Sequence, residues 1–143
     1  MIDVLDSEVL IARFGRWPSF HDAEVLAVRL DSGRLAEGRP SIELDIHLFA
    51  VDGTHADGTM NYAQHTLATI RFEDTGEVEI EAFGPQNVLD NLLIEAADPP
   101  RSTRVMLPSN NGLTAEFTCH RVSIVAVTPF TPGPHSVYHR QSE

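Results

Sequence analysis

Alternation of apolar and polar side chains is the main pattern in the middle of this chain. Successive side chains of a β-strand point to opposite faces, so a period of two indicates a strand with one buried face. Residues 41–50 show this pattern most clearly. Their inward positions are Ile42, Leu44, Ile46 and Leu48, and their outward positions are Glu43, Asp45 and His47. The same period predicts strands at 23–30, with Leu26, Val28 and Leu30 on one face, and at 65–74 and 77–83.

A helical period occurs at the start of the chain and predicts a helix over residues 3–14. Its apolar positions are Leu5, Val9 and Ala12. Asp3 precedes them as a candidate N-cap, because a short acidic side chain accepts hydrogen bonds from the first free backbone N–H groups. Gly15 follows and suits the left-handed conformation that often ends a helix.

Glycine, proline and polar clusters predict the connections between these elements. The segment between residues 30 and 41 contains two glycines and a proline before the next strand, and reads as a hairpin connection with a long loop. Residues 51–64 are polar and glycine-containing, and we expect a mobile loop there. A helical turn near residues 86–91, running into a strand, is expected next. Further strands are expected at 103–109, 113–120 and 121–129, with a hairpin turn at 109–112.

Seven or eight strands with at most two short helices indicate an α+β fold made mainly of antiparallel β-sheet. The expected architecture is a sandwich or a partly closed barrel, with one N-terminal helix and one short helical turn. A chain of 143 residues fits one domain. We assign residues 1–130 to a single β-rich domain and residues 131–143, which have prolines and no apolar period, to an extended C-terminal tail.

The charge balance narrows the possible partners. The chain carries 21 acidic and 10 basic side chains, for a formal net charge of −11. Nucleic acid and anionic membrane surfaces are unexpected partners, because both require a basic surface. An acidic surface favours solubility and fast association with a basic partner.

Sequence features also restrict the compartment and the chemistry. No apolar run is long enough to span a bilayer, and the N-terminus lacks the positive region of a signal peptide. A single cysteine, Cys119, excludes an internal disulfide, so we expect a cytoplasmic protein. All ten basic residues are arginine, which rules out a lysine Schiff base and a Walker A phosphate loop.

One short segment, residues 16–25, concentrates side chains that often carry function. They are Trp17, Pro18, Phe20, His21, Asp22 and Glu24. The structural interpretation makes the aromatic pair a core anchor beside a turn. A metal-dependent enzyme or small-molecule binder using His21, Asp22 and His47 is an alternative. It has the difficulty that adjacent residues of a strand point to opposite faces. We therefore assign no metal site, no cofactor and no catalytic residue.

Acidic side chains form a second candidate site. Glu77, Glu79 and Glu81 share one face of the predicted strand 77–83, and Glu43 and Asp45 repeat the theme on another strand. Like charges in neighbouring register destabilise a sheet. Either arginines intervene, for which Arg29, Arg71 and Arg121 are the candidates, or a basic partner covers the acids.

Several segments together resemble the immunity protein 50 family, from about residue 14 to residue 128. They are "WPSFHDAEVLAVRLD" (17–31), an alternating strand "IELDIHLF" (42–49), "ATIRFEDTGEVEIEAFGPQNVL" (68–89) and "FTCHRVSIVAV" (117–127). The most recognisable parts are "PSFHDAEV" and "F-x-x-QNV".

The resemblance implies a small bacterial protein that is encoded beside a polymorphic or contact-dependent toxin, binds that toxin and blocks it. It implies no enzyme activity and assigns no catalytic residues. Because an immunity surface must follow its particular toxin, we expect the shared motif to be structural and the five acids to be the candidate toxin-binding residues. An acidic interaction module of another complex remains an alternative, and the oligomeric state is left open.

Overall fold

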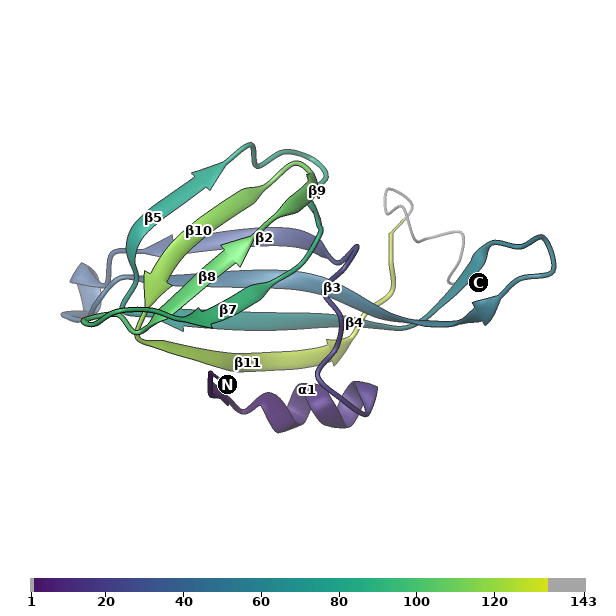
Figure 1. Cartoon of the computed structure of the whole chain (residues 1–143), viewed down its shortest axis with the longest axis horizontal. Helices are drawn as coiled ribbons and strands as arrows, with labels where there is room; N and C mark the ends of the chain where they lie inside the picture. The colour runs from purple at the N-terminus through teal and green to yellow at the C-terminus, as the bar shows by residue number, and fades with distance from the viewer. Residues whose placement is uncertain (1, 134–143) are drawn as a thin grey trace.

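The computed structural model describes residues 2–133, and their strands form two sheets that pack face to face (Figure 1). Sheet A has seven strands in the order β1-β11-β4-β3-β2-β6-β9. Their bounds are β1 Val4–Leu5, β2 Glu24–Asp31, β3 Ser41–Thr54, β4 Met60–Glu73, β6 Val88–Leu89, β9 Ser109–Asn111 and β11 Arg121–Pro129. Sheet B has four strands in the order β5-β10-β8-β7. Their bounds are β5 Gly76–Glu81, β7 Leu93–Ala96, β8 Thr103–Leu107 and β10 Thr114–Cys119.

The predicted fold class is confirmed, and the choice between barrel and sandwich is now made. Every strand pair is antiparallel except β1 with β11, and the two sheets do not close into a barrel. Within residues 2–133, two helical elements accompany the sheets, namely the helix α1 (Ser7–Phe14) and the short 3-10 turn η1 (Arg34–Ala36).

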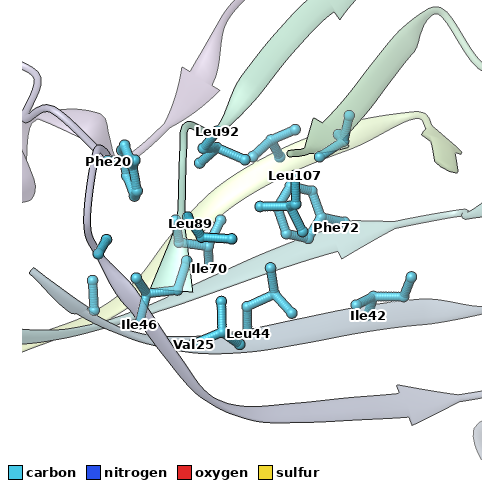
Figure 2. Close-up of a cluster of buried hydrophobic side chains, with 14 of the residues drawn as sticks. Phe20, Val25, Ile42, Leu44, Ile46, Ile70, Phe72, Leu89, Leu92 and Leu107 are labelled. Carbon is cyan, nitrogen blue, oxygen red and sulfur yellow. The ribbon is translucent and has the colours of Figure 1, made fainter. Parts of the chain in front are cut away.

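The core lies between the two sheets, where the alternating apolar positions meet. Ile42, Leu44 and Ile46 of β3 are almost fully buried, as the alternation predicts. Figure 2 shows them beside residues of β4, with Leu107 of sheet B close to Phe72 of sheet A. Phe72 also meets Phe117 of β10 at a centroid distance of 5.0 Å, edge to face. Such aromatic contacts across the interface add to the burial that holds the two sheets together.

The N-terminal helix is shorter than predicted, and its buried side differs. Val4 and Leu5 form a strand beside β11, and the N-cap position falls to Asp6, so the predicted cap by Asp3 is wrong. Leu10 is the buried residue, whereas Val9 is 49% exposed. The end of the helix is as predicted, because Gly15 adopts a left-handed conformation with φ of 80° and its N–H donates to the Ile11 carbonyl.

A bulge in β2 changes the predicted buried face at Leu26, whereas Val28 keeps its predicted face, opposite Leu44 and packed against the core. The register with β3 shifts between Val25 and Ala27, so an extra residue, Leu26, stands at the bulge and is 41% exposed. Val25 is buried in its place, opposite Ile46. Strict alternation cannot reveal such a shift, because an inserted residue puts the side chains before it out of phase with those after it.

Two connections differ from the sequence-based expectation. Residues 51–64, predicted as a mobile loop, continue β3 and β4 as a long hairpin that extends away from the sandwich (Figure 1). The helical turn predicted near residues 86–91 is absent, since β6 forms there and pairs with β2. The one short helical turn in the described residues is instead η1, which lies in the connection between β2 and β3.

The predicted turn at 109–112 joins antiparallel β8 and β10, but it also supplies strand β9 to sheet A. None of the helices within residues 2–133 is long and apolar enough to span a membrane. Residues 134–143, most of the expected C-terminal tail, lie outside the described residues.

Candidate functional site

The aromatic part of the segment 16–25 belongs to the core. Phe20 is 1% exposed, and Pro18 is buried. The Trp17 ring packs on Phe20 at a centroid distance of 5.6 Å and contacts the edge of the core. These three side chains therefore pack into or against the core where the chain passes from α1 into β2.

His21 and Asp22 occupy a turn at the surface, before β2 begins. The side chain of His21 is 61% exposed, and its Nδ1 lies 3.2 Å from the carbonyl oxygen of Asp90. Asp22 has a φ of 65°, a left-handed conformation that aspartate tolerates better than most residues. Its N–H donates to the Leu89 carbonyl, and its carboxylate accepts a hydrogen bond from the Asn110 amide. Both residues thus link the first motif to the segment 89–110.

The two most recognisable motifs of the sequence lie side by side, although more than sixty residues separate them. Ala23 and Val25 exchange backbone hydrogen bonds with residues of the segment 87–89. Asn87 is 3% exposed, and its side-chain oxygen accepts from the N–H groups of Gly84 and Leu113. Its amide group donates to the carbonyls of Gly84 and Val25. One asparagine therefore joins β2, the segment before β6 and the start of β10.

A glycine is also required at position 112, next to the segments that Asn87 joins. Its φ is 76°, in the left-handed region, and a Cβ atom at this position would stand 2.2 Å from the Gln86 carbonyl oxygen and 2.7 Å from the Asn87 side-chain oxygen. No larger residue fits without moving the backbone that Asn87 holds.

Glu24 and His47 are buried, in contrast to the outward and solvated position predicted for His47. Glu24 lies opposite His47 in the pairing of β2 with β3, and it is 6% exposed. Burial raises the pKa of the Glu24 carboxyl. His47 is fully buried, and its Nε2 lies 2.9 Å from Nδ1 of His65, so a single proton is shared between the two rings. Burial, and then repulsion by His65, lowers the pKa of His47 to about 4.

The arrangement does not bring His21, Asp22 and His47 together. His21 and Asp22 line a cleft of about 350 Å³ between the end of α1 and the long hairpin. His47 is not among the residues that line it, and its ring instead packs beside the Phe130 ring at a centroid distance of 4.8 Å. Within the described ranges, no group of three or more His, Cys, Asp or Glu side chains is arranged to hold a metal ion.

The acids of β3 face outward from sheet A and are paired with arginines. Arg29 of β2 donates to both Glu43 and Asp45, with its closest nitrogen 2.7 Å from the Asp45 carboxylate. Arg71 of β4 donates to Glu43 at 2.6 Å from the other side. The Arg29 hydrogen bond lowers the pKa of Asp45. Arginine relief, one of the two predicted explanations for the acid stripe, therefore applies to these two residues; Arg121 instead pairs with Glu73.

The acids of β5 face outward from sheet B, on the opposite side of the sandwich, and they differ in their surroundings. Glu79 lies directly opposite Glu116 of β10, and Glu81 lies opposite Thr114. Among the described residues, neither Glu79 nor Glu81 forms an ion pair, whereas Glu116 lies 3.5 Å from Arg104. The register shifts next to Glu77, whose φ is 51°, so this residue is not in line with the other two.

Apolar side chains continue the row that Glu79 and Glu116 begin. Met106 of β8 is opposite Glu116, and Leu93 of β7 is opposite Met106, so one row crosses all four strands. These four residues and Glu81 line a shallow hollow of about 380 Å³. We call this row with Glu81 the sheet B face. It combines unpaired carboxylates at one edge with half-buried apolar side chains toward the other.

Sequence reasoning missed Glu116, Leu93 and Met106 as members of this face. The alternation within 114–119 places Glu116 outward, but only the strand pairing reveals that it stands opposite Glu79. Residues that are remote in sequence meet through register, and register depends on the turns and bulges of the whole sheet.

Comparison with known protein families identifies a match. The model of the family described as Immunity protein 50 matches residues 6–130, nearly the whole chain. No curated protein and no solved structure matches the chain.

Proposed function

The chain belongs to the Immunity protein 50 family, and on this premise we propose that it binds a cognate toxin domain and neutralises it without catalysing a reaction. It acts in the cytoplasm of the cell that makes the toxin. We choose the outer face of sheet B as the toxin-binding surface because Glu79 and Glu116 lie directly opposite each other there.

Two carboxylates directly opposite each other destabilise a sheet, because like charges repel across neighbouring strands. Glu81 adds a third carboxylate beside them, and Arg104 contacts Glu116 alone. A basic partner surface placed on this face would replace the repulsion with attraction. The charge also speeds the encounter, since opposite potentials steer two proteins together.

The apolar part of the sheet B face can slow the dissociation of a complex, which the charges alone do not. Leu93 and Met106 are half-buried in the free protein and lie toward the edge formed by β7. Contacts in the centre of an interface that exclude water limit dissociation, whereas peripheral charges act mainly on association. A partner with basic side chains around an apolar or arginine anchor fits this combination, as in a toxin with a basic substrate-binding cleft.

The remaining candidates are less suited to the role. Glu43 and Asp45 already form ion pairs with two arginines of the same chain, and a partner would have to compete with those ion pairs. The motif containing Phe20 and Asp22 contacts the segment 87–110 of the same chain. We therefore assign the motif to the architecture that supports both sheets, and the sheet B face to the toxin.

Co-expression with the toxin-like C-terminal domain encoded beside this gene tests the function. Survival of the host together with co-purification of the two chains is the expected result. Loss of viability despite abundant folded protein, with no complex recovered, would contradict neutralisation by binding. A stable complex with a neighbour that is not toxic on its own would favour the interaction-module alternative.

A further inference from the structure

Sheet B ends in an edge strand, β7, that is open to pairing with another chain. The edge strands of sheet A are very short, since β1 has two residues and β9 has three. The other edge of sheet B, β5, has a register shift beside Glu77 and carries three glutamates, and both features discourage pairing. β7 pairs with β8 over all four of its residues without a shift and contains neither proline nor lysine. Among the described residues, no strand pairs with its other side (Figure 1).

The pairing with β8 shows which backbone groups of β7 are free. Just beyond the strand, the Ala97 N–H donates to the Ser102 carbonyl, so this pair of the ladder is hydrogen-bonded. Hydrogen-bonded and non-hydrogen-bonded pairs alternate in an antiparallel ladder, so every second residue counted back from Ala97 bonds to β8. The residues between them are Ile94 and Ala96. Their N–H and C=O groups therefore point to the open edge, where no described backbone group bonds to them.

The side chains of β7 continue both layers of the sandwich to this edge. Leu93 lines the hollow of the sheet B face, and Ile94 packs against the core. A strand added to β7 would place its own alternate side chains beside Leu93 on the outside and beside Ile94 on the inside. The open edge is therefore continuous with the surface that we assign to the toxin.

The charge on β7 distinguishes between possible partners. Glu95 is exposed and forms no ion pair with any described residue, whereas Arg104 opposite it pairs with Glu116. A second copy of this chain is a poor partner. The two-fold register that uses all the free backbone groups places Glu95 directly opposite Glu95 of the other copy, and facing like charges destabilise a sheet. A strand with a basic side chain at that position replaces this repulsion with attraction.

We propose that the toxin domain adds an extended segment to β7, with a basic side chain beside Glu95 and apolar side chains beside Leu93 and Ile94. The proposal rests on the proposed function, because it names the part of the toxin that meets the edge of the sheet B face. Main-chain hydrogen bonds to the edge then contribute affinity, and the alternating side chains contribute specificity.

Amide hydrogen exchange followed by NMR tests the edge directly. In the free protein, the amides of Ile94 and Ala96 are expected to exchange about tenfold or more faster than the neighbouring amides that bond to β8. Addition of the purified toxin domain that gives rescue in co-expression is expected to slow both amides about tenfold or more. The amide of Leu35, on the exposed turn η1, is the internal control and is expected to keep its rate.

Substitutions at the edge test the same contact by affinity. Ala96→Pro removes an outward N–H group, and an edge strand tolerates proline where its N–H faces solvent. It is expected to weaken toxin binding about tenfold in calorimetric titration, whereas the matched control Ala96→Ser keeps the N–H and is expected to bind like wild type. Glu95→Gln is expected to weaken binding about threefold at low salt and less at high salt. Circular dichroism establishes that the three variants are folded.

Four outcomes would overturn the proposal. Slow exchange of Ile94 and Ala96 in the free monomer would show that this chain itself already covers the edge. A dimer of the free protein that protects the same amides would make a second copy the occupant. A toxin complex in which both amides exchange as fast as in the free protein would exclude strand addition and leave neutralisation intact. Co-expression with neither rescue nor a complex would overturn the proposed function, and this inference with it.

Discussion

Asn87 connects three separate segments of the described fold through one buried side chain. It is buried, and its four hydrogen bonds join Gly84, Val25 and Leu113. Gly112 leaves the space that this network occupies. The shared "F-x-x-QNV" sequence and the "PSFHDAEV" sequence are therefore parts of one corner, and they hold β6 against β2 on one side and the start of β10 on the other.

Replacement Asn87→Ala is expected to lower the free energy of unfolding by about 2–3 kcal/mol, because the N–H groups of Gly84 and Leu113 lose their acceptor while staying inside the protein. The matched control, Asn110→Ala, removes an exposed hydrogen bond to Asp22 and should change stability by less than about 0.5 kcal/mol. Urea denaturation followed by tryptophan fluorescence measures both. Equal effects of the two substitutions would show that Asn87 does not hold the corner.

Sequence alone identified these residues as notable but not what they contact. Phe20 and the inward positions of β3 could be predicted, because burial follows from apolar type and alternation. The hydrogen bonds of Asn87 with residue 25 and residue 113 could not be predicted. The sequence around an asparagine does not indicate which distant backbone groups its side chain will contact. The sequence predicts Glu24 as part of the motif in 16–25 and His47 as an outward position of its strand, and the register places them together in a buried layer.

At the scale of elements, four segments meet at His65. Its ring contacts His47 of β3, and its carbonyl accepts hydrogen bonds from the Phe130 N–H after β11 and from Arg13 of α1. Burial lowers the pKa of His65 as well as that of His47. The charged groups facing the pair among the described residues are Arg13 and, from β2, Glu24. An additional proton on either ring would place a positive charge in this buried layer, next to the other ring.

This junction predicts a loss of stability in acid. Below pH about 6.5 the unfolded chain protonates His47, whereas the folded protein resists protonation until pH about 4. The unfolded state then binds more protons, so the free energy of unfolding falls as pH decreases through this window, by on the order of 2 kcal/mol, and is insensitive to His47 above it. Glu24 acts in the opposite sense, because its pKa is raised.

The comparison that isolates His47 is the pH slope of the melting temperature in the wild type and in His47→Phe. The slope between pH 4 and pH 6.5 should be shallower in the variant, whereas the exposed His120→Gln control should keep the wild-type slope. An unchanged slope in His47→Phe would show that His47 does not cause the loss of stability in acid.

Elements were predicted well where a pattern is long and uninterrupted. The central strands of sheet A and the end of α1 followed from alternation and from Gly15. The bulge at Leu26, the strand β6 and the extension of the hairpin did not follow, because each depends on a neighbouring strand. Polar residues 51–64 favour a loop on composition, yet pairing between β3 and β4 continues through them.

At the scale of the whole molecule, the two outer faces of the sandwich have different electrostatic character. On sheet A, Arg29 and Arg71 neutralise Glu43 and Asp45. On sheet B, Glu79 and Glu81 have no such partner among the described residues. The formal charge of the chain is −11, and two of the acids without an ion pair among the described residues, Glu79 and Glu81, line the hollow beside Met106. The net charge was readable from composition, but the division between faces required the fold.

The central claim is that the sheet B face receives the toxin, and association kinetics test it most directly. Stopped-flow mixing with the purified toxin domain compares wild type, Glu79→Gln/Glu81→Gln and the control Asp3→Asn/Glu37→Gln, which removes two exposed charges elsewhere, each at low and high salt. At low salt the sheet B variant should associate about five- to tenfold more slowly and lose most of its salt dependence, while the control matches wild type. Equal association rates for the two variants would contradict the assignment of this face to the toxin.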